Sequence, residues 1–511
     1  MQAAVIDSAI ELATYVPVPL SPMFNKNFLL GFSLSGFQFE MGLSEADEQS
    51  DWWKWVHDKN NIRSGIVSGD MPENGVAYWD LYETYNSAAR DLGANALRLG
   101  IEWSRIFPKA SKDVKVEVEL DNSDITGIHI TEDSLSEMDR IANKKAIERY
   151  KSIFRNVKNN KLKLIVNVYH WPIPLELHDP IISRQTGLNS EKNGWLNHQT
   201  VIEFTKYAAY VAWKFDDFAD WFSIMNEPNV IYGNGYFNVK SGFPPGYPST
   251  EAGNLSKKHI IESIARSYDE MKKFTKKPVG LIYANADFVP QTDDDREAVE
   301  IALYNERYSF FDSLRSGDMP WVKAVSDATV FMEESSEIRK DLKNKLDWIG
   351  VNYYTRNVVK KTANGYTVLK GYGHNATPRM LSKDNRPVSD FGWEVYPEGI
   401  YNVLKQYNDR YRLPMIVTEN GIADSKDELR PRYFVSHLNQ VEKAKEDGMD
   451  VRGYLHWSLI DNYEWSSGYG LKFGMLGVDL KTKKIQMRPS ALLFKYVSQN
   501  WAVPEELKWM T

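Results

Sequence analysis

Cysteine is absent from all 511 residues of the chain. Disulfides, a thiolate nucleophile and cysteine-ligated metal centres are therefore excluded. A chain of this length can bury a large core without disulfides, and a lack of cysteine fits a reducing compartment. We expect a cytoplasmic protein.

The sequence also lacks the features of membrane and nucleic-acid proteins. No apolar run approaches the roughly 18 residues needed to cross a bilayer. The first 22 residues carry Asp7 and Glu11 and no positively charged start, so they resemble a short extension more than a signal peptide. Lys and Arg number 62 against 69 Asp and Glu, and the net charge of −7 offers no basic face for nucleic acid. We predict no nucleic-acid partner and no membrane partner.

Signatures of cofactor and metal enzymes are missing as well. There is no phosphate-binding glycine loop, no Gly-x-Gly-x-x-Gly after a strand, and no Gly-x-Ser-x-Gly elbow. The nine histidines form no His-x-x-x-His pair within a predicted helix. We therefore predict neither a cofactor nor a bound metal.

What the chain does contain is a regular alternation of short apolar runs and longer amphipathic stretches. The apolar runs are nearly continuous, as in strands that are covered on both faces. They are Phe28–Gly36, Ala94–Trp103, Lys161–Trp171, Asp220–Asn226, Val279–Asn285, Leu346–Tyr354, Pro414–Glu419 and Val451–Ser458. Helices are predicted between them, including Tyr78–Leu92, Asn143–Lys158, Gln199–Phe218 and Leu255–Phe274.

Eight strands alternating with helices predict an α/β protein with a single (β/α)8 TIM barrel. Two inserts account for the extra length. Residues 109–142 contain an alternating run followed by an acidic stretch, and residues 357–393 contain a predicted hairpin that turns at Asn364-Gly365. Because both inserts follow barrel strands, we expect both to build walls around the mouth of the barrel. We predict a barrel domain over residues 23–511, preceded by an extension over residues 1–22.

Polar side chains follow seven of the eight predicted strands. In chain order the strands end at Gln38, Arg98, His170, Asn226 with Glu227, Asn285, Asn352 with Tyr354, Glu419 and Trp457. The carboxyl ends of barrel strands converge on one face, where the active sites of this fold are found. Any one of these residues could have a structural role. A whole ring is harder to explain in that way, because each buried polar group without a partner costs about 1–3 kcal/mol.

Two glutamates stand out in this ring. Glu227 and Glu419 each follow an apolar strand directly, and Pro228 or Gly421 then turns the chain away. A facing pair of carboxyl groups is the minimum needed for glycoside hydrolysis, with one protonated and the other ionised. The cation of Arg98 is the best candidate to keep Glu419 ionised.

Several motifs resemble glycoside hydrolase family 1, and its archaeal β-galactosidase/β-glucosidase branch in particular. Asn226-Glu227-Pro228 is similar to the family's acid/base motif, Thr418-Glu419-Asn420-Gly421 to its nucleophile motif, and residues 457–465 to its sugar-binding stretch. The similarity runs from about Phe24 to about Ala502. It implies a retaining exo-β-glycosidase that releases terminal β-D-glucosyl or β-D-galactosyl residues through a covalent glycosyl-enzyme, with transglycosylation as an open possibility.

The resemblance also implies a role for each site residue. Glu419 would be the nucleophile and Glu227 the general acid/base, with carboxyl groups about 5–5.5 Å apart. Substrate-binding residues would be Gln38, His170, Asn226, Tyr354, Trp457, Glu464 and Trp465, and the nucleophile would be supported by Arg98 and Asn352. β-Glycosides and small oligosaccharides would be the ligands, and the chain would form a homo-oligomer, either a tetramer or a dimer.

Three alternatives stay open at this point. A 6-phospho-β-glycosidase would need cations near the sugar 6-position, where Glu464 would instead repel a phosphate and where Lys472 is the one nearby cation. A sugar-binding barrel without activity would be expected to have lost one of the two carboxylates. The cluster Trp52, Trp53 and Trp55 could line the pocket, although packing of its loop on the barrel is the preferred interpretation.

Overall fold

The computed structural model describes residues 24–25, 27–327 and 330–511. The predicted extension, residues 1–22, lies outside the described residues. The domain boundary at residue 23 therefore stays a prediction.

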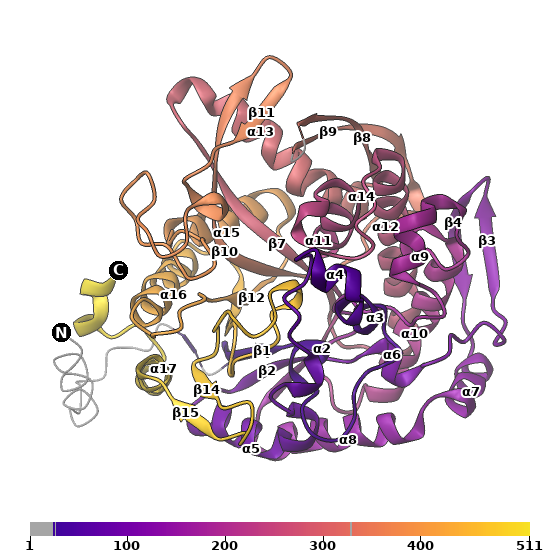
Figure 1. Cartoon of the computed structure of the whole chain (residues 1–511), viewed down its shortest axis with the longest axis horizontal. Coiled ribbons are helices and arrows are strands. Elements are labelled where there is room, and N and C mark those ends of the chain that lie inside the picture. Colours follow the sequence, from indigo (N-terminus) through magenta and orange to yellow (C-terminus); the bar gives the residue numbers. More distant parts are fainter. Residues whose placement is uncertain (1–23, 26, 328–329) are drawn as a thin grey trace.

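Eight parallel strands close into a barrel at the centre of the molecule (Figure 1). They are β1 (Leu29–Leu34), β2 (Ala96–Gly100), β5 (Lys163–Asn167), β6 (Trp221–Asn226), β7 (Val279–Pro290), β10 (Trp348–Thr362), β12 (Met415–Asn420) and β13 (Val451–His456). Each strand pairs in parallel with the next, and β13 pairs with β1 to close the ring. All eight predicted strands form, and the predicted (β/α)8 fold is confirmed.

Helices surround the barrel and cover the outer faces of the strands (Figure 1). The main ones are α5 (Tyr78–Asp91), α8 (Lys144–Asn159), α10 (His198–Phe215), α12 (Thr250–Phe274), α14 (Ser309–Ser316), α15 (Glu398–Tyr411), α16 (Arg430–Glu446) and α17 (Pro489–Asn500). All four predicted helices are present. Helix α12 begins five residues before the predicted Leu255, because the side chain of Ser249 accepts a hydrogen bond from the backbone N–H of Ala252 and caps it there.

The interior of the barrel is filled by side chains, so it is a core and not a channel. One layer takes a single apolar residue from each strand: Leu29, Ala96, Ile165, Trp221, Ile282, Trp348, Ile416 and Leu455. A much larger apolar cluster fills the space between the strands and the helices. The two clusters leave the carboxyl ends of the strands as the place where polar side chains gather.

The two inserts have different positions. The first forms a hairpin of β3 (Glu117–Asp121) and β4 (Asp124–His129) and then α7 (Glu132–Ile141). It packs against α10 and α12 on the outside of the barrel and does not reach the mouth. The expectation that it would wall the mouth is wrong, because its apolar side chains Ile125, Leu135 and Met138 are buried in the outer core.

The second insert does reach the mouth, as expected. Strand β10 continues past the barrel and pairs with the antiparallel β11 (Gly365–Val368). Thr362 pairs with Gly365, so the turn consists of Ala363 and Asn364 and lies one residue earlier than predicted. The rest of this insert brings Phe391 and Trp393 to the mouth of the barrel.

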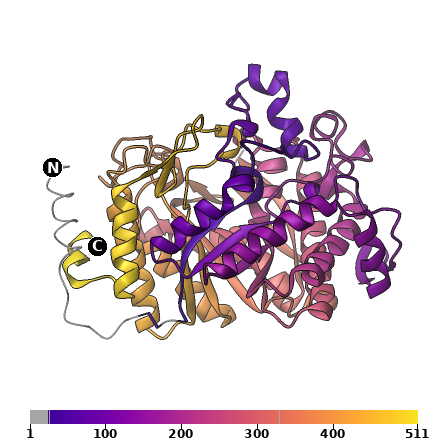
Figure 2. The same cartoon turned by 90° about the horizontal axis from the view of Figure 1, so that it is seen from below.

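Some elements were not predicted from the sequence. An antiparallel pair, β8 (Asp318–Asp327) and β9 (Val330–Ile338), lies outside the barrel. Two short helices, α3 (Asp51–His57) and α4 (Lys59–Arg63), stand above one end of the barrel (Figure 2). Of the helices in the described ranges, none combines the length and the apolar character that crossing a membrane requires.

Candidate active site

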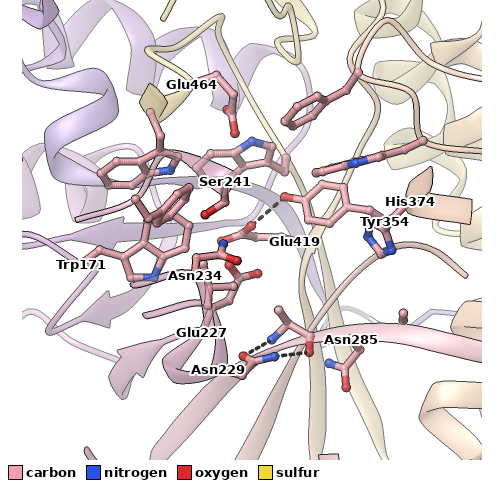
Figure 3. Close-up of a pocket in the computed structure, with 18 of the residues that line it drawn as sticks. Trp171, Glu227, Asn229, Asn234, Ser241, Asn285, Tyr354, His374, Glu419 and Glu464 are labelled. Carbon is pink, nitrogen blue, oxygen red and sulfur yellow. Dashed lines mark hydrogen bonds between the residues drawn. The ribbon is translucent and has the colours of Figure 1, made fainter. Parts of the chain in front are cut away.

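A cavity of about 500 Å³ opens at the carboxyl ends of the barrel strands (Figure 3). Eight of the predicted site residues line it: Gln38, His170, Glu227, Tyr354, Glu419, Trp457, Glu464 and Trp465. The other three, Arg98, Asn226 and Asn352, are fully buried behind this lining. The fold thus brings all eleven residues to one place from positions spread over more than 400 residues of sequence.

Glu419 lies near the end of β12 and receives two strong hydrogen bonds. The guanidinium of Arg98 donates to its Oε1 at 2.5 Å. The phenol of Tyr354 donates to its Oε2 at 2.7 Å, as Figure 3 shows. Arg98 is completely buried, and Glu419 is only 4% exposed. Charge-assisted bonds of this kind stabilise negative charge and also fix the orientation of the carboxylate. Arg98, expected to support Glu419, and Tyr354, expected to bind substrate, therefore both contact this carboxylate.

Glu227 follows β6 and begins the short helix α11 (Pro228–Tyr232). Its φ of 47° lies in the left-handed region, an uncommon conformation for a residue with a side chain, which turns the chain sharply at the barrel mouth. Burial and the negative charge of Glu419 raise the pKa of Glu227 to about 8, although the hydrogen bond from Asn352 and the charge of Arg98 oppose the shift. The carboxyl group is accordingly protonated at neutral pH.

Three buried amide and imidazole groups connect the two glutamates. Asn226 accepts from Arg98 at 2.8 Å and from Asn352 at 3.1 Å, and its Nδ2 lies 3.0 Å from the His170 ring. Asn226 does not line the cavity in this structure, so its predicted contact with the substrate 2-hydroxyl stays a prediction. Burial and the cation of Arg98 hold the pKa of His170 well below its usual range, so the ring is neutral.

Asn352 differs from its predicted role. It was expected to support Glu419, and it lies opposite Glu419 in the register of β10 and β12. Its side chain, however, points the other way, because Thr418 donates to its Oδ1 at 2.7 Å and turns its Nδ2 to Glu227 at 2.8 Å. The structure therefore associates Asn352 with Glu227, not with Glu419.

Gln38 and Glu464 meet on the side of the cavity opposite Glu227. Gln38 lies in the short helix α2 (Gly36–Phe39) after β1, and its amide donates to Glu464 Oε2 at 3.3 Å. In Figure 3, Glu464 points into the cavity toward Glu419. Burial and the charge of Glu419 raise the pKa of Glu464 to about 8. This pair offers several hydrogen-bonding groups to a polyhydroxylated ligand.

Aromatic rings form the wall between these polar groups. Trp465 stacks on His170, with ring centroids 5.8 Å apart, and contacts Trp171 at 4.5 Å. Trp457 lies nearly parallel to the His170 ring at 6.1 Å. Trp52 packs behind Trp465 at 4.5 Å and does not line the cavity, so the packing interpretation of the tryptophan cluster holds for it. Flat aromatic faces beside hydrogen-bonding groups suit the C–H faces and hydroxyls of a sugar.

Several cavity residues were missed by the sequence analysis. They are Trp171, Asn229, Val230, Asn234, Ser241, Phe243, Asn357, His374, Phe391, Trp393 and Phe473, among others. They lie in loops, in short helical segments and in the part of β10 that continues past the barrel. No periodic pattern marks such positions, although the aromatic content of 13% was a general signal.

The cavity does not suit a phosphorylated sugar. Lys472 is half-buried but does not line the cavity, and among the described lining residues the one permanent cation is Arg307. Arg307 already donates to the carbonyl oxygen of Ala286 and to the side chain of Gln406. No lining cation therefore stands beside Glu464 to neutralise a phosphate.

Comparison with known proteins agrees with this geometry. The family model described as glycosyl hydrolase family 1 matches residues 20–119 and 138–502. The unmatched residues 120–137 lie within the first insert and include most of the outer hairpin. The match covers every barrel strand and all eleven site residues.

Relatives of high identity span nearly the whole chain. A β-galactosidase of Saccharolobus solfataricus is 49% identical over 95% of this chain and 97% of its own length, and a β-galactosidase of Pyrococcus woesei is 42% identical over 95% and 99%. Among solved structures, the β-glycosidase of Thermosphaera aggregans superposes with a TM-score of 0.90 at 46% identity, covering 96% of this chain and 99% of its own. The chain belongs to glycosyl hydrolase family 1 and is a retaining β-glycosidase.

Proposed function

We propose that Glu419 is the nucleophile and Glu227 the general acid/base of this β-glycosidase. The observation that carries the proposal is the contrast between their surroundings. Glu419 receives an arginine and a tyrosine donor, whereas Glu227 is buried with a neutral amide and has a pKa of about 8. One carboxyl group is thus prepared to attack and the other to donate a proton.

The reaction follows from these protonation states. The Glu419 carboxylate forms a bond to the anomeric carbon while the glycosidic C–O bond breaks and Glu227 gives its proton to the departing oxygen. The ester formed on Glu419 carries no negative charge, so the pKa of Glu227 falls. Glu227 can then take a proton from water, which attacks the anomeric carbon and releases the sugar with its configuration retained.

Substrate specificity is the next part of the proposal. Terminal β-D-glucosyl and β-D-galactosyl residues would bind with their remote hydroxyls on Gln38 and Glu464 and their neighbouring hydroxyls on His170 and Trp465, above the ring of Trp457. The names of the relatives, β-galactosidase and β-glucosidase, support this substrate class. The polar groups of Gln38 and Glu464 together provide both donors and acceptors, which suits either orientation of the 4-hydroxyl.

Covalent labelling tests the proposal directly. The full-length protein is incubated with the 2-deoxy-2-fluoro-β-glucosyl and β-galactosyl fluorides, and its intact mass and peptides are measured. One added sugar on the peptide that contains Glu419 is expected, and the faster label ranks the two sugars. Label on another peptide, or cleavage of aryl glycosides without any label, would remove Glu419 from its role.

Two variants assign the roles separately. Glu419→Gln should abolish formation of the glycosyl-enzyme, because an amide is a poor nucleophile. Glu227→Gln should retain activity only on substrates with very good leaving groups, since those need no proton. Wild-type turnover in Glu419→Gln would contradict the assignment.

We further propose that the protein works as a homo-oligomer, either a tetramer or a dimer. One similar solved structure is described as derived from a hyperthermophilic tetrameric β-glucosidase. Near the C-terminus, the side chain of Trp509 is 71% exposed in the single chain and is available to a contact between subunits. Light scattering of the purified protein should give a mass of two or four times 58.9 kDa, and a monomer at assay concentration would contradict the proposal.

The expected cytoplasmic location is also a proposal. Its support is the complete lack of cysteine, which fits a reducing compartment. Cell fractionation followed by activity measurement tests it, and activity outside the cytoplasm would overturn it.

A further inference from the structure

A second group of reactive side chains lies away from the cavity. His198 is the first residue of α10, and His259 and Glu262 lie three residues apart on one face of α12. Figure 1 shows these two helices beside the β3–β4 hairpin on the outside of the barrel. One ligand atom from each of the three residues lies within 4.8 Å of the other two. The histidines are 61 residues apart in sequence, so no short spacing indicates their meeting.

His259 and Glu262 each bring an acceptor atom without a partner to this place. The Nδ1–H of His259 donates to the carbonyl of Trp195 at 2.8 Å, which leaves the lone pair on Nε2, a buried atom with no hydrogen-bond partner. Oε1 of Glu262 accepts from Arg339 at 2.9 Å, whereas its Oε2 is buried without a partner. The two residues are 2% and 0% exposed. Two unpartnered acceptors buried in one such group are unfavourable unless a proton or a cation satisfies them.

His198 completes the group from the solvent side. It is half-buried, and its ring hydrogen-bonds to the backbone of Ser123 in the hairpin. Its ring centroid lies 4.5 Å from that of His259. An ion could therefore enter past His198, and water could complete its coordination from the same side.

We propose that His198, His259 and Glu262 form a binding site for a divalent transition metal ion, with zinc as the best fit. Two imidazole nitrogens and a carboxylate oxygen are typical zinc ligands, whereas magnesium and calcium prefer oxygen ligands alone. The bond from His259 Nδ1–H to a backbone carbonyl is the usual arrangement that orients a metal-binding histidine. Tetrahedral bonds of about 2.0–2.1 Å place ligand atoms about 3.3 Å apart, so small side-chain movements would close the site.

The charged neighbours are compatible with an ion here. Lys258 forms an ion pair with Asp124, and Arg339 pairs with Asp124 at 2.7 Å, with Asp341 at 2.8 Å and with Glu262 at 2.9 Å. Both cations are thus already compensated by carboxylates.

The ion would have a structural effect and no direct part in glycoside cleavage. It would join the start of α10 to α12, and none of its three ligands lines the cavity. Bound metal should therefore raise the Tm of the enzyme and leave kcat/KM unchanged.

Metal binding to the full-length protein tests the proposal. The wild type is stripped with a chelator, titrated with ZnCl2 against a competing dye, and assayed for metal content by mass spectrometry. His198→Asn and Glu262→Gln remove one ligand each with little change in shape, and His129→Gln is the control, because His129 is an exposed histidine on the same hairpin, paired with Glu119. Circular dichroism of each metal-free variant checks that it is folded.

One zinc ion per chain is expected in the wild type and in His129→Gln, with affinity at least tenfold weaker in each ligand variant. Zinc should raise the Tm of the wild type but not of His198→Asn. Crystals of the zinc-treated wild type should give an anomalous peak between the three side chains. Equal affinity in all variants, or no peak at this position, would overturn the proposal and leave a direct His259–Glu262 proton contact as the explanation.

Discussion

Replacing Glu419 with glutamine should lower the pKa of Glu227. The negative charge of Glu419 is the second-largest cause, after burial, of the rise in the pKa of Glu227 from 4.5 to about 8. Glutamine has nearly the same size as glutamate but no charge. Glu419→Gln therefore imitates the glycosyl-enzyme, in which the ester has removed the same charge.

The size of the effect follows from the expected carboxyl separation. Two unit charges about 5.5 Å apart at an effective dielectric constant of about 20 interact by about 3 kcal/mol. At about 1.4 kcal/mol for each pKa unit, the pKa of Glu227 should fall by roughly 2 units. Burial is unchanged by the substitution, so the pKa should stay above the ordinary value of 4.5.

Carbon-13 NMR of the glutamate carboxyl groups measures this shift. The wild type and Glu419→Gln are titrated, and the Glu227→Gln variant identifies the resonance of Glu227. In the wild type, kcat/KM should also fall as the pH rises through about 8, because the proton needed by the leaving group is lost. The reasoning would be refuted by an unchanged pKa of Glu227 in Glu419→Gln, because the two carboxyl groups would then not be coupled.

Three further predictions concern the nucleophile, the metal and the core. Tyr354→Phe removes a 2.7 Å hydrogen bond to the Glu419 carboxylate, worth about 1.5–3 kcal/mol, and should lower kcat/KM about 10- to 150-fold. The control Tyr401→Phe removes a comparable bond to Asp447 and should leave kcat/KM unchanged. Equal kcat/KM in the two variants would contradict the role of Tyr354. Treatment with a chelator should leave kcat/KM intact even though it lowers the Tm, and inhibition reversed by a divalent ion would place a metal in the reaction. Phe204→Ala leaves a cavity at a fully buried site between α10 and the barrel, and should reduce the free energy of unfolding by about 3–5 kcal/mol in denaturant titrations. A reduction below about 1 kcal/mol would contradict this prediction.

The sequence predicted the barrel because its signals are local. Strands covered on both faces must be apolar throughout, and each of the eight runs met this requirement in its own few residues. Helix starts were less certain, as at α12, where a single serine cap decided the boundary. The first insert was misplaced because an alternating pattern is typical of a strand with one buried face but does not say which surface that face packs against.

The sequence predicted which residues form the site better than it predicted which of them contact one another. Arg98, Tyr354, Glu227 and Glu419 could be predicted as site residues because they lie at the ends of predicted strands, and a parallel barrel places all these ends on one face. Which carboxyl group Asn352 would meet depended on a side-chain rotation set by Thr418, and neither residue signals this alone. No regular spacing in the sequence predicts the other residues of the cavity or the proximity of His198 to His259.

For this protein, the sequence by itself determined the fold class, the family and which two carboxyl groups are proposed to be catalytic, because apolar periodicity and short motifs are properties of neighbouring residues. The tertiary structure alone decided the protonation states, since the pKa values of Glu227 and Glu464 depend on burial and on charges contributed by distant strands. It also decided the shape of the cavity and the grouping of His198, His259 and Glu262. Electrostatic and coordination effects act over a few ångströms of space, and only the folded chain determines which residues lie within that range.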